Sequence, residues 1–418
     1  MDSSRLSTAS EGLQLIAPVP RISVQSFCES TEVATVIDEA TKDRRLSKAH
    51  VKTHMGGIPA AIEAFRSAPT PNLIVIESDS NRGALVQQLE SLAEFCDAGT
   101  KVMVIGHEND ISLYRDLISR GVSDYVVAPI DPLGFIRQIS ALYNGQNKEA
   151  IGRVIAVVGA KGGVGASTLS HNLAWSISRE LQLQTIIADL DLPFGTAGLD
   201  FNQDPPQGIA EAVFSPERLD ANFMDRLLSK CSDTLSILAA PVSTERNYDL
   251  SEQSFEGLLD ILRDTSPAVV LDVPHQWLGW TRRVLVGADE VAIVVTPDLA
   301  NLRNAKILMD SLRAARPNDM SPHVIINMTG VPKRPEIPIA DFAKAMELTP
   351  LGTIPFDPKL FGTATNNGQM LAEVEASSKI VETIDEMGKQ LMGRGGSRRI
   401  KKTLLGPLLR RFSGVKAS

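Results

Sequence analysis

Hydrophobic and polar positions along the first third of the chain alternate in a way that predicts five β-strands with helices between them. Apolar runs of strand length and stretches with helical spacing follow one another from residue 21 to residue 146. The expected strands are residues 22–27, 49–53, 73–76, 102–105 and 125–127, and the expected helices are residues 31–41, 59–67 and 110–120. Five strands that alternate with helices predict a doubly wound parallel sheet.

A second alternating series of the same kind follows and predicts a second α/β domain with a doubly wound sheet. The polar segment at residues 145–150 is the expected linker, and a glycine-rich segment at residues 393–397 separates the second series from the end of the chain. We therefore expect a disordered N-terminus (1–20), a first α/β domain (21–146), a second α/β domain (150–392) and a basic amphipathic tail (393–418).

The composition places the protein among ordinary globular proteins, with 43% hydrophobic and 22% charged residues. The three cysteines are far apart and form no C-x-x-C pair, so we expect neither a disulfide framework nor a cysteine zinc site. The polar N-terminus does not resemble a secretory signal, and no apolar run approaches the roughly 20 residues that span a bilayer. These features favour a cytoplasmic protein.

The charge is distributed unevenly along the chain. The net charge is −8, but residues 394–418 hold eight basic residues and no acidic residue, which leaves −16 on the rest. Apolar residues recur every four positions from Ile400 to Phe412, a cationic amphipathic pattern suited to an anionic membrane surface, although Gly406-Pro407 interrupts any helix there. A soluble tail, or a tail that docks on an acidic partner, is the open alternative.

A glycine-rich loop carries the clearest chemistry of the sequence. A β-branched strand at residues 154–158 leads into GAKGGVGAST (159–168), and a helical stretch follows. This order presents backbone N–H groups and a helix N-terminus to an anion, and the glycines let the backbone wrap phosphates where a Cβ would clash. Ser167 lies where a hydroxyl reaches Mg²⁺, and Thr168 lies where a side chain touches the α-phosphate. A glycine turn used only for packing is the alternative that this combination of features argues against.

Carboxylates follow two later strands. Residues 185–188 lead into Asp189-Leu-Asp191, and residues 268–271 lead into Asp272. Such an aspartate often only caps a helix or turn. Two of them behind a phosphate loop favour a ligand site at the carboxyl edge of the sheet, where doubly wound folds bind their ligands.

Together these motifs resemble the ParA/MinD superfamily of partitioning and positioning ATPases, which have a deviant Walker A loop. Four segments are similar to one branch, the CpaE/TadZ proteins of Flp/Tad pilus assembly: GAKGGVGAST-x-x-HNLA, DLDLPFGTAGLDF, ADEVAIVVTPDLANLRNAK and IPFDPKLFGTATNNGQM. The resemblance covers about residues 150–390. It implies a P-loop NTPase fold of the ParA/MinD type, with ATP and Mg²⁺ as cofactors.

The resemblance also implies roles for individual residues. Lys161 matches the signature lysine that reaches the partner's phosphates across an ATP-dependent dimer, and Asp191 matches the carboxylate that orients the attacking water; these two are the expected catalytic residues. Asp189 and Asp272 match the aspartates that hold Mg²⁺ through water, beside Ser167, and Asn327 matches the asparagine that recognises the base. The expected nucleotide-binding set is Lys161, Gly162, Gly163, Val164, Gly165, Ala166, Ser167, Thr168 and Asn327.

One position departs from the pattern of the superfamily. The lysine that normally follows the last glycine of the loop is Ala166 here. That lysine supplies positive charge to the β- and γ-phosphates in the transition state. Losing one such contact costs about 2–4 kcal/mol, or about 10²–10³ in rate. We therefore expect an ATP-binding protein with slow or absent hydrolysis.

The first domain resembles a two-component receiver domain that lacks the receiver's chemistry. The positions of the paired acids, the phosphoaccepting aspartate, the hydroxyl and the lysine read Ser26-Phe27, Glu77, Gly106 and Ala128. Without the acids and the lysine, neither Mg²⁺ nor an acyl phosphate is stabilised, so we predict a pseudo-receiver used for docking or localisation. Glu77 either mimics a phosphorylated aspartate or, as we favour, is a solvated strand end.

The resemblance implies an ATP-dependent homodimer that acts as a positional switch in Flp/Tad-type pilus assembly. Its expected partners are pilus or secretion-machine components, and its expected place is the cytoplasm, the periphery of the inner membrane or a cell pole. A chromosome- or plasmid-partitioning ATPase is one alternative, although the acidic body argues against binding to nucleic acid. A structural scaffold that does not hydrolyse ATP is the other.

Overall fold

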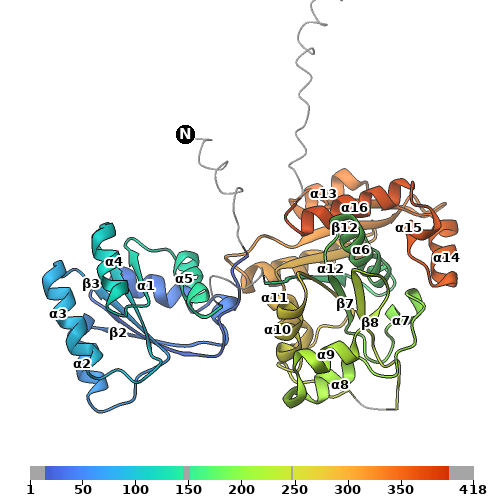
Figure 1. Ribbon diagram of the computed structural model, residues 1–418. Helices are drawn as coiled ribbons and strands as arrows, with labels where there is room; N and C mark the ends of the chain where they lie inside the picture. The colour runs from blue at the N-terminus through green and yellow to red at the C-terminus, as the bar shows by residue number, and fades with distance from the viewer. Residues whose placement is uncertain (1–14, 145–150, 246–247, 395–418) are drawn as a thin grey trace, which may run out of the picture.

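The computed structural model describes residues 15–144, 151–245 and 248–394 and contains two separate parallel sheets, each covered by helices (Figure 1). The elements of the first unit are β1 (Ser23–Cys28), α1 (Thr31–Ala40), the 3₁₀ turn η1 (Arg44–Leu46), β2 (His50–Met55), α2 (Gly57–Phe65), β3 (Leu73–Ser78), α3 (Arg82–Ala93), β4 (Lys101–Gly106), α4 (Ile111–Ser119), β5 (Asp124–Val127) and α5 (Pro132–Asn144). The strand order is β2-β1-β3-β4-β5, which confirms the predicted doubly wound sheet.

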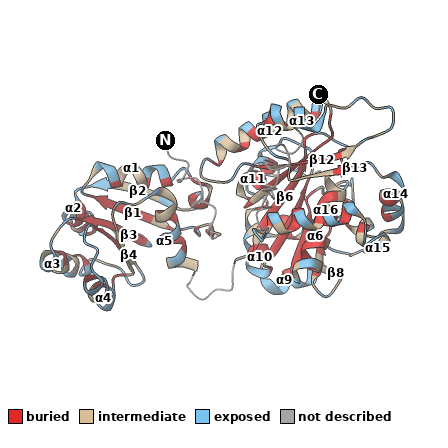
Figure 2. Cartoon of the chain, turned by 90° about the horizontal axis from the view of Figure 1, so that it is seen from above, coloured by how far each residue is buried: buried red, intermediate tan, exposed pale blue. Residues whose placement is uncertain are grey.

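Successive side chains along the strands of the first sheet point to opposite faces, and both faces of the sheet are buried. In β3, Leu73 and Val75 pack into one hydrophobic cluster, whereas Ile74 and Ile76 pack into another on the opposite face. Helices cover both faces, so the strands read as nearly continuous apolar runs, as expected for a parallel sheet. Figure 2 shows buried residues concentrated in the strands and exposed residues on the outer sides of the helices.

Residues 15–20, which the sequence placed in a disordered N-terminus, instead pack against the first unit. Ile16 and Val19 belong to its hydrophobic core, the Val19 amide donates to the Arg45 carbonyl, and the Ser140 hydroxyl donates to the Ala17 carbonyl. Burial of these apolar side chains therefore holds the short segment against the first unit, although the sequence before it is polar. Residues 1–14, the expected linker at 145–150 and nearly all of the expected tail (395–418) lie outside the described residues.

The second unit holds an eight-stranded sheet with the order β13-β12-β11-β6-β10-β7-β9-β8, in which only the short edge strand β8 is antiparallel. Its elements are β6 (Arg153–Gly159), α6 (Ala166–Leu181), β7 (Thr185–Asp189), α7 (Ala197–Asp200), α8 (Ile209–Phe214), η2 (Pro216–Arg218), α9 (Ala221–Leu227), β8 (Ser229–Lys230), β9 (Leu235–Leu238), α10 (Glu256–Thr265), β10 (Ala268–Val273), α11 (Gly279–Gly287), β11 (Glu290–Val295), α12 (Leu299–Ala315), β12 (His323–Thr329), α13 (Ile339–Met346), β13 (Gly352–Pro355), α14 (Pro358–Asn367), α15 (Leu371–Val374) and α16 (Lys379–Leu391).

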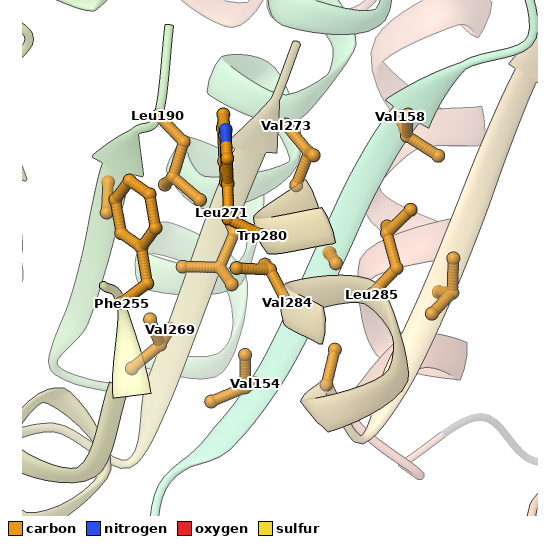
Figure 3. Packing of buried hydrophobic residues seen from close by; sticks show 14 of the residues in the cluster. Val154, Val158, Leu190, Phe255, Val269, Leu271, Val273, Trp280, Val284 and Leu285 are labelled. Carbon is orange, nitrogen blue, oxygen red and sulfur yellow. The ribbon is translucent and has the colours of Figure 1, made fainter. Parts of the chain in front are cut away.

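The core of the second unit fixes the central strands. Phe255 and Trp280 lie with their ring centroids 4.8 Å apart and pack with Leu271 and with four valines of β6 and β10, namely Val154, Val158, Val269 and Val273 (Figure 3). This packing holds β6, which leads into the glycine loop, beside β10, which carries Asp272. No described helix is both long and apolar enough to cross a membrane.

Buried charges join the two units. The Arg44 Nε atom in η1 donates to Asp319 at 2.6 Å, and its Nη2 atom lies 3.3 Å from Asp289; Arg45 also pairs with Asp319. The side chains of Arg44, Asp289 and Asp319 are between 4% and 6% exposed. Burial alone raises the pKa of Asp319, but the charges and hydrogen bonds of Arg44, Arg45 and Arg316 lower it to about 2.

Asp319→Asn will lower the stability of the protein because it removes the anion that the buried guanidinium groups of Arg44, Arg45 and Arg316 share. We expect a loss of about 3 kcal/mol at pH 7, measured by urea unfolding. Because the folded-state pKa is depressed, the contribution of Asp319 is present above about pH 4 and is lost as the pH falls toward 2. The difference between variant and wild type will therefore shrink over that interval. Asp310→Asn, which changes an exposed acid on α12, is the control and will change the free energy of unfolding little. Equal stability of Asp319→Asn and wild type at pH 7 would show that the buried charges between the two units do not stabilise the protein.

Candidate functional site

The glycine loop has the backbone geometry that a phosphate chain requires. Strand β6 ends at Gly159 and α6 begins at Ala166, with Gly163 (φ 78°) and Gly165 (φ 82°) in the left-handed region that favours glycine. A Cβ placed on Gly162 or Gly163 meets no atom within 4 Å, so the backbone there is open to a ligand. The half-buried residues 166–168 form the first turn of α6, whose free N–H groups favour an anion. The loop therefore fits a nucleotide phosphate chain.

Two of the predicted carboxylates meet at the carboxyl edge of the sheet. Asp189 in β7 and Asp272 in β10 are direct neighbours in the strand register, and both are buried. Asp189 accepts hydrogen bonds from the Asp191 amide (3.1 Å) and the Ala197 amide (3.0 Å). Burial first, and then the charge of Asp272, raise the pKa of Asp189 to about 7. This pair of buried acids favours binding of a cation.

Asp191 lies two residues further along, in the turn after β7. Its side chain is partly exposed and accepts a hydrogen bond from the Phe194 amide at 3.3 Å. Burial, followed by the charge of Asp272, raises its pKa above the usual value. The carboxylate therefore lies near Asp189 and Asp272, and its role in orienting water stays a prediction.

His171 is a member of this site that the sequence did not single out. It is fully buried in α6, where its Nδ1 atom lies 2.7 Å from Asp200 and its Nε2 atom lies 3.6 Å from Asp272. Burial alone lowers the pKa of His171, but the hydrogen bond to Asp200 and the nearby carboxylate of Asp272 raise it to about 10. The available signal is its spacing: Ser167 and His171 are four residues apart and share one face of the helix.

Lys161 is exposed at the start of the loop. Burial raises the pKa of Asp298, but hydrogen bonds from Thr296 and Asn301 and the charge of Lys161 lower it below its usual value. The Lys161 ammonium group therefore acts near the N-terminus of α12. Its reach across a dimer stays a prediction.

Asn327 lies on the other side of the loop, at the end of β12. Its side chain is buried, and the Nδ2 atom donates to the Val164 carbonyl at 2.8 Å. Beside it lies a cavity of about 140 Å³. The cavity is lined by Gly165, Thr168, Asn327, Met328, Pro355, Phe356, Asp357, Pro358, Phe361 and Thr365. Asn327 thus both braces the loop and borders a space next to the phosphate position, and recognition of the base stays a prediction.

Two further contacts brace the loop, and the sequence did not reveal them. The His275 Nδ1 atom donates to the Gly159 carbonyl at 2.8 Å, and the Asn304 Nδ2 atom donates to the Ala160 carbonyl at 3.0 Å. His275 follows β10 and Asn304 belongs to α12, so the loop is tied to both neighbouring segments. Neither residue belongs to a spaced motif from which its contact with the loop could be predicted.

Glu77, at the receiver-like position of the first unit, is buried and hydrogen-bonded, and this corrects the expectation for it. Glu77 is 1% exposed rather than solvated. Its carboxylate accepts hydrogen bonds from the Glu29 amide (2.8 Å), the Ser30 amide (2.8 Å) and the Ser30 hydroxyl (2.7 Å), and it contacts His107. The glutamate is long enough to reach the loop after β1 and to hold the start of α1.

The expected position of the paired acids is also corrected. Strand β1 extends to Cys28, so Ser26 and Phe27 lie within the strand, and Glu29 and Ser30 are the residues that meet Glu77. One acid, Glu29, is therefore present, but its carboxylate accepts a hydrogen bond from the Asp79 amide. The strand has the expected length but begins and ends one residue later than its apolar alternation indicates.

We expect the first unit not to accept phosphate, because Glu77 is already bonded on both oxygens and Ala128 offers no cation. Incubation with acetyl phosphate and Mg²⁺, followed by intact-mass measurement, will show no added phosphoryl group. A stable adduct on Glu77 would contradict this prediction.

Comparisons with known proteins give three findings, although no family model matches the chain. The solved structure of the pilus assembly protein CpaE from Caulobacter crescentus CB15 is 44% identical to this chain, covers 30% of this chain and 97% of its own, and has a TM-score of 0.30. A ParA family ATPase from Chlorobium tepidum is 24% identical over 56% of this chain and 98% of its own, with a TM-score of 0.52. The septum site-determining protein MinD of Synechocystis is 26% identical over 250 residues, 58% of this chain and 90% of MinD. The similarity to the CpaE structure is one of sequence identity, and the similarity to the ParA family ATPase shows a shared fold.

Proposed function

Because this chain belongs to the CpaE family of pilus assembly proteins, we propose that it is an ATP-binding regulatory and localisation protein of a Flp/Tad-type pilus assembly machine. The observation that carries the proposal is the open glycine loop at the start of α6, with Asp272 on β10 beside β6 and Asp189 on β7, the next strand of the sheet. An anion site and a pair of buried acids at one sheet edge are what a nucleotide with its divalent cation requires.

Each part of the site has a role in this proposal. The backbone N–H groups of residues 162–168 hold the phosphates, and the Ser167 hydroxyl holds Mg²⁺, with Asp189 and Asp272 acting through water. Bound Mg²⁺ neutralises charge on the phosphates. Asn327, at the edge of the 140 Å³ cavity, recognises the base. Asp191 orients water, and Lys161 completes the site of a second copy of the chain.

The absence of the lysine that normally follows the last glycine of the loop supports a switch rather than a fast enzyme. Ala166 places no charge at the phosphates, so hydrolysis is slow or absent and the ATP-bound dimer is long-lived. Such a dimer marks a position in the cell for pilus or secretion-machine components. Contact with an anionic membrane surface belongs to the basic tail, which lies outside the described residues.

The proposal is tested by blocking the loop in cells that depend on this protein for pili. Gly163→Val fills the open side of the loop, and we expect it to abolish pilus assembly and the localisation of a fluorescent fusion. Gly99→Val is the matched control, because Gly99 also has positive φ (93°) and nothing within 4 Å of its Cβ position, but lies in the first unit. Normal piliation with Gly163→Val, at wild-type protein levels, would overturn the proposal.

A further inference from the structure

Three buried side chains converge within the second unit in a way that nucleotide binding does not require. The ligand atoms of His171, Asp189 and Asp272 all lie within 4.8 Å of one another. The two aspartates come from adjacent strands, and the histidine comes from α6, which packs against β10. Among the described residues this is the one group of histidine, cysteine and acidic side chains with such spacing.

The histidine is oriented as a ligand. Its Nδ1 atom lies 2.7 Å from the Asp200 carboxylate, and its fully buried Nε2 atom has no hydrogen-bond partner within the described residues. Histidines that bind metals usually donate one ring N–H to a carboxylate, which fixes the ring and points the other nitrogen at the metal. Asp200 supplies that support here.

The donor set selects the kind of cation. One imidazole nitrogen and two carboxylates suit Mn²⁺, Fe²⁺, Co²⁺ or Zn²⁺, whereas Mg²⁺ prefers oxygen ligands and keeps several waters. Donor atoms about 2.1 Å from one tetrahedral ion lie about 3.4 Å apart, so atoms that now lie within 4.8 Å of one another must approach by up to about 1.4 Å when the ion binds. The negative surroundings of His171 attract such a cation, which takes the place of the Nε2 proton.

We propose that His171, Asp189 and Asp272 form a direct binding site for a divalent transition-metal ion, supported by Asp200. The site shares Asp189 and Asp272 with the Mg²⁺ position proposed above, but the chain adds a nitrogen ligand, both aspartates bind the ion directly, and no phosphate is needed. The inference therefore does not depend on the proposed function.

The test is a titration of the chelator-treated full chain with Mn²⁺ in the absence of nucleotide. Binding is measured as the decrease of the electron paramagnetic resonance signal of free Mn²⁺. We expect one Mn²⁺ per chain, not displaced by an equal concentration of Mg²⁺. His171→Asn will abolish the site, and Asp200→Asn will weaken it by about 10–100-fold. His107→Gln, which removes a histidine paired with Glu77 in the first unit, will leave binding unchanged.

Pulsed resonance of Mn²⁺ bound to the wild-type protein identifies the ligand without any variant. Modulation by ¹⁴N is expected, because the imidazole nitrogen coordinates the ion. Three results would overturn the proposal: the wild-type protein does not bind Mn²⁺, the bound Mn²⁺ shows no ¹⁴N modulation, or His171→Asn binds Mn²⁺ as well as wild type does. Failure of the proposed function appears separately, as absent binding of an ATP analogue.

Discussion

Ala166→Lys will raise the rate of ATP hydrolysis by about 10²–10³-fold, which corresponds to about 2–4 kcal/mol of transition-state stabilisation. Ala166 is the first residue of α6, directly after Gly165, so a lysine there starts from the helix end that faces the phosphates. The rest of the loop is open, and Asp189, Asp191 and Asp272 stand at the neighbouring strand ends. We therefore expect the missing charge to limit hydrolysis more than any other feature.

Phosphate release at saturating ATP and Mg²⁺ measures this effect. Ala166→Met is the matched control, because methionine has a similar length but no charge, and it will not raise the rate. Two results would contradict the account: turnover by the unmodified protein at the level of an ordinary P-loop ATPase, or equal acceleration by methionine and lysine.

Lys161→Ala will abolish ATP-induced dimerisation but retain ATP binding. Lys161 is exposed and acts near the N-terminus of α12 rather than at the N-terminus of α6, where we propose that the phosphates bind. A contact from this lysine to the phosphates of a second copy is charge-assisted and is worth about 1.5–3 kcal/mol. A symmetric dimer has two such contacts, so losing both weakens association by about 10²–10⁴-fold.

Light scattering of both proteins with and without ATP decides this prediction, and binding of an ATP analogue is measured in parallel. Lys344→Ala, at an exposed lysine on α13, is the control and will dimerise like wild type. A Lys161→Ala protein that dimerises with ATP as readily as wild type would show that the cross-interface role is wrong.

The sequence predicted both sheets because their buried strands are short apolar runs such as residues 73–76 and 154–158. The sequence predicted the helices less completely. Helix α3 buries fully only Leu85 and Leu92, so its apolar stripe is too thin to stand out. Helix α5 buries Phe135, Ile136 and Ile139, a helical spacing that was within reach of the same argument. Local periodicity thus captures elements with a wide buried face.

The parts of the site that the sequence missed depend on contacts between distant residues. Asp200 orients His171 from 29 positions away, and Arg44 meets Asp319 from 275 positions away. No local pattern encodes such pairs. By contrast, the glycine loop and the aspartates at strand ends were accessible, because their chemistry is tied to fixed positions in consecutive elements.

The central claim is that the loop at residues 159–168 binds ATP, and equilibrium binding of a fluorescent ATP analogue to the purified full chain tests it most directly. The account predicts saturable binding of one analogue per chain in the presence of Mg²⁺, displacement by unlabelled ATP, and loss of binding in Gly163→Val but not in Gly99→Val. No saturable binding by folded wild-type protein, or equal binding by Gly163→Val, would contradict it.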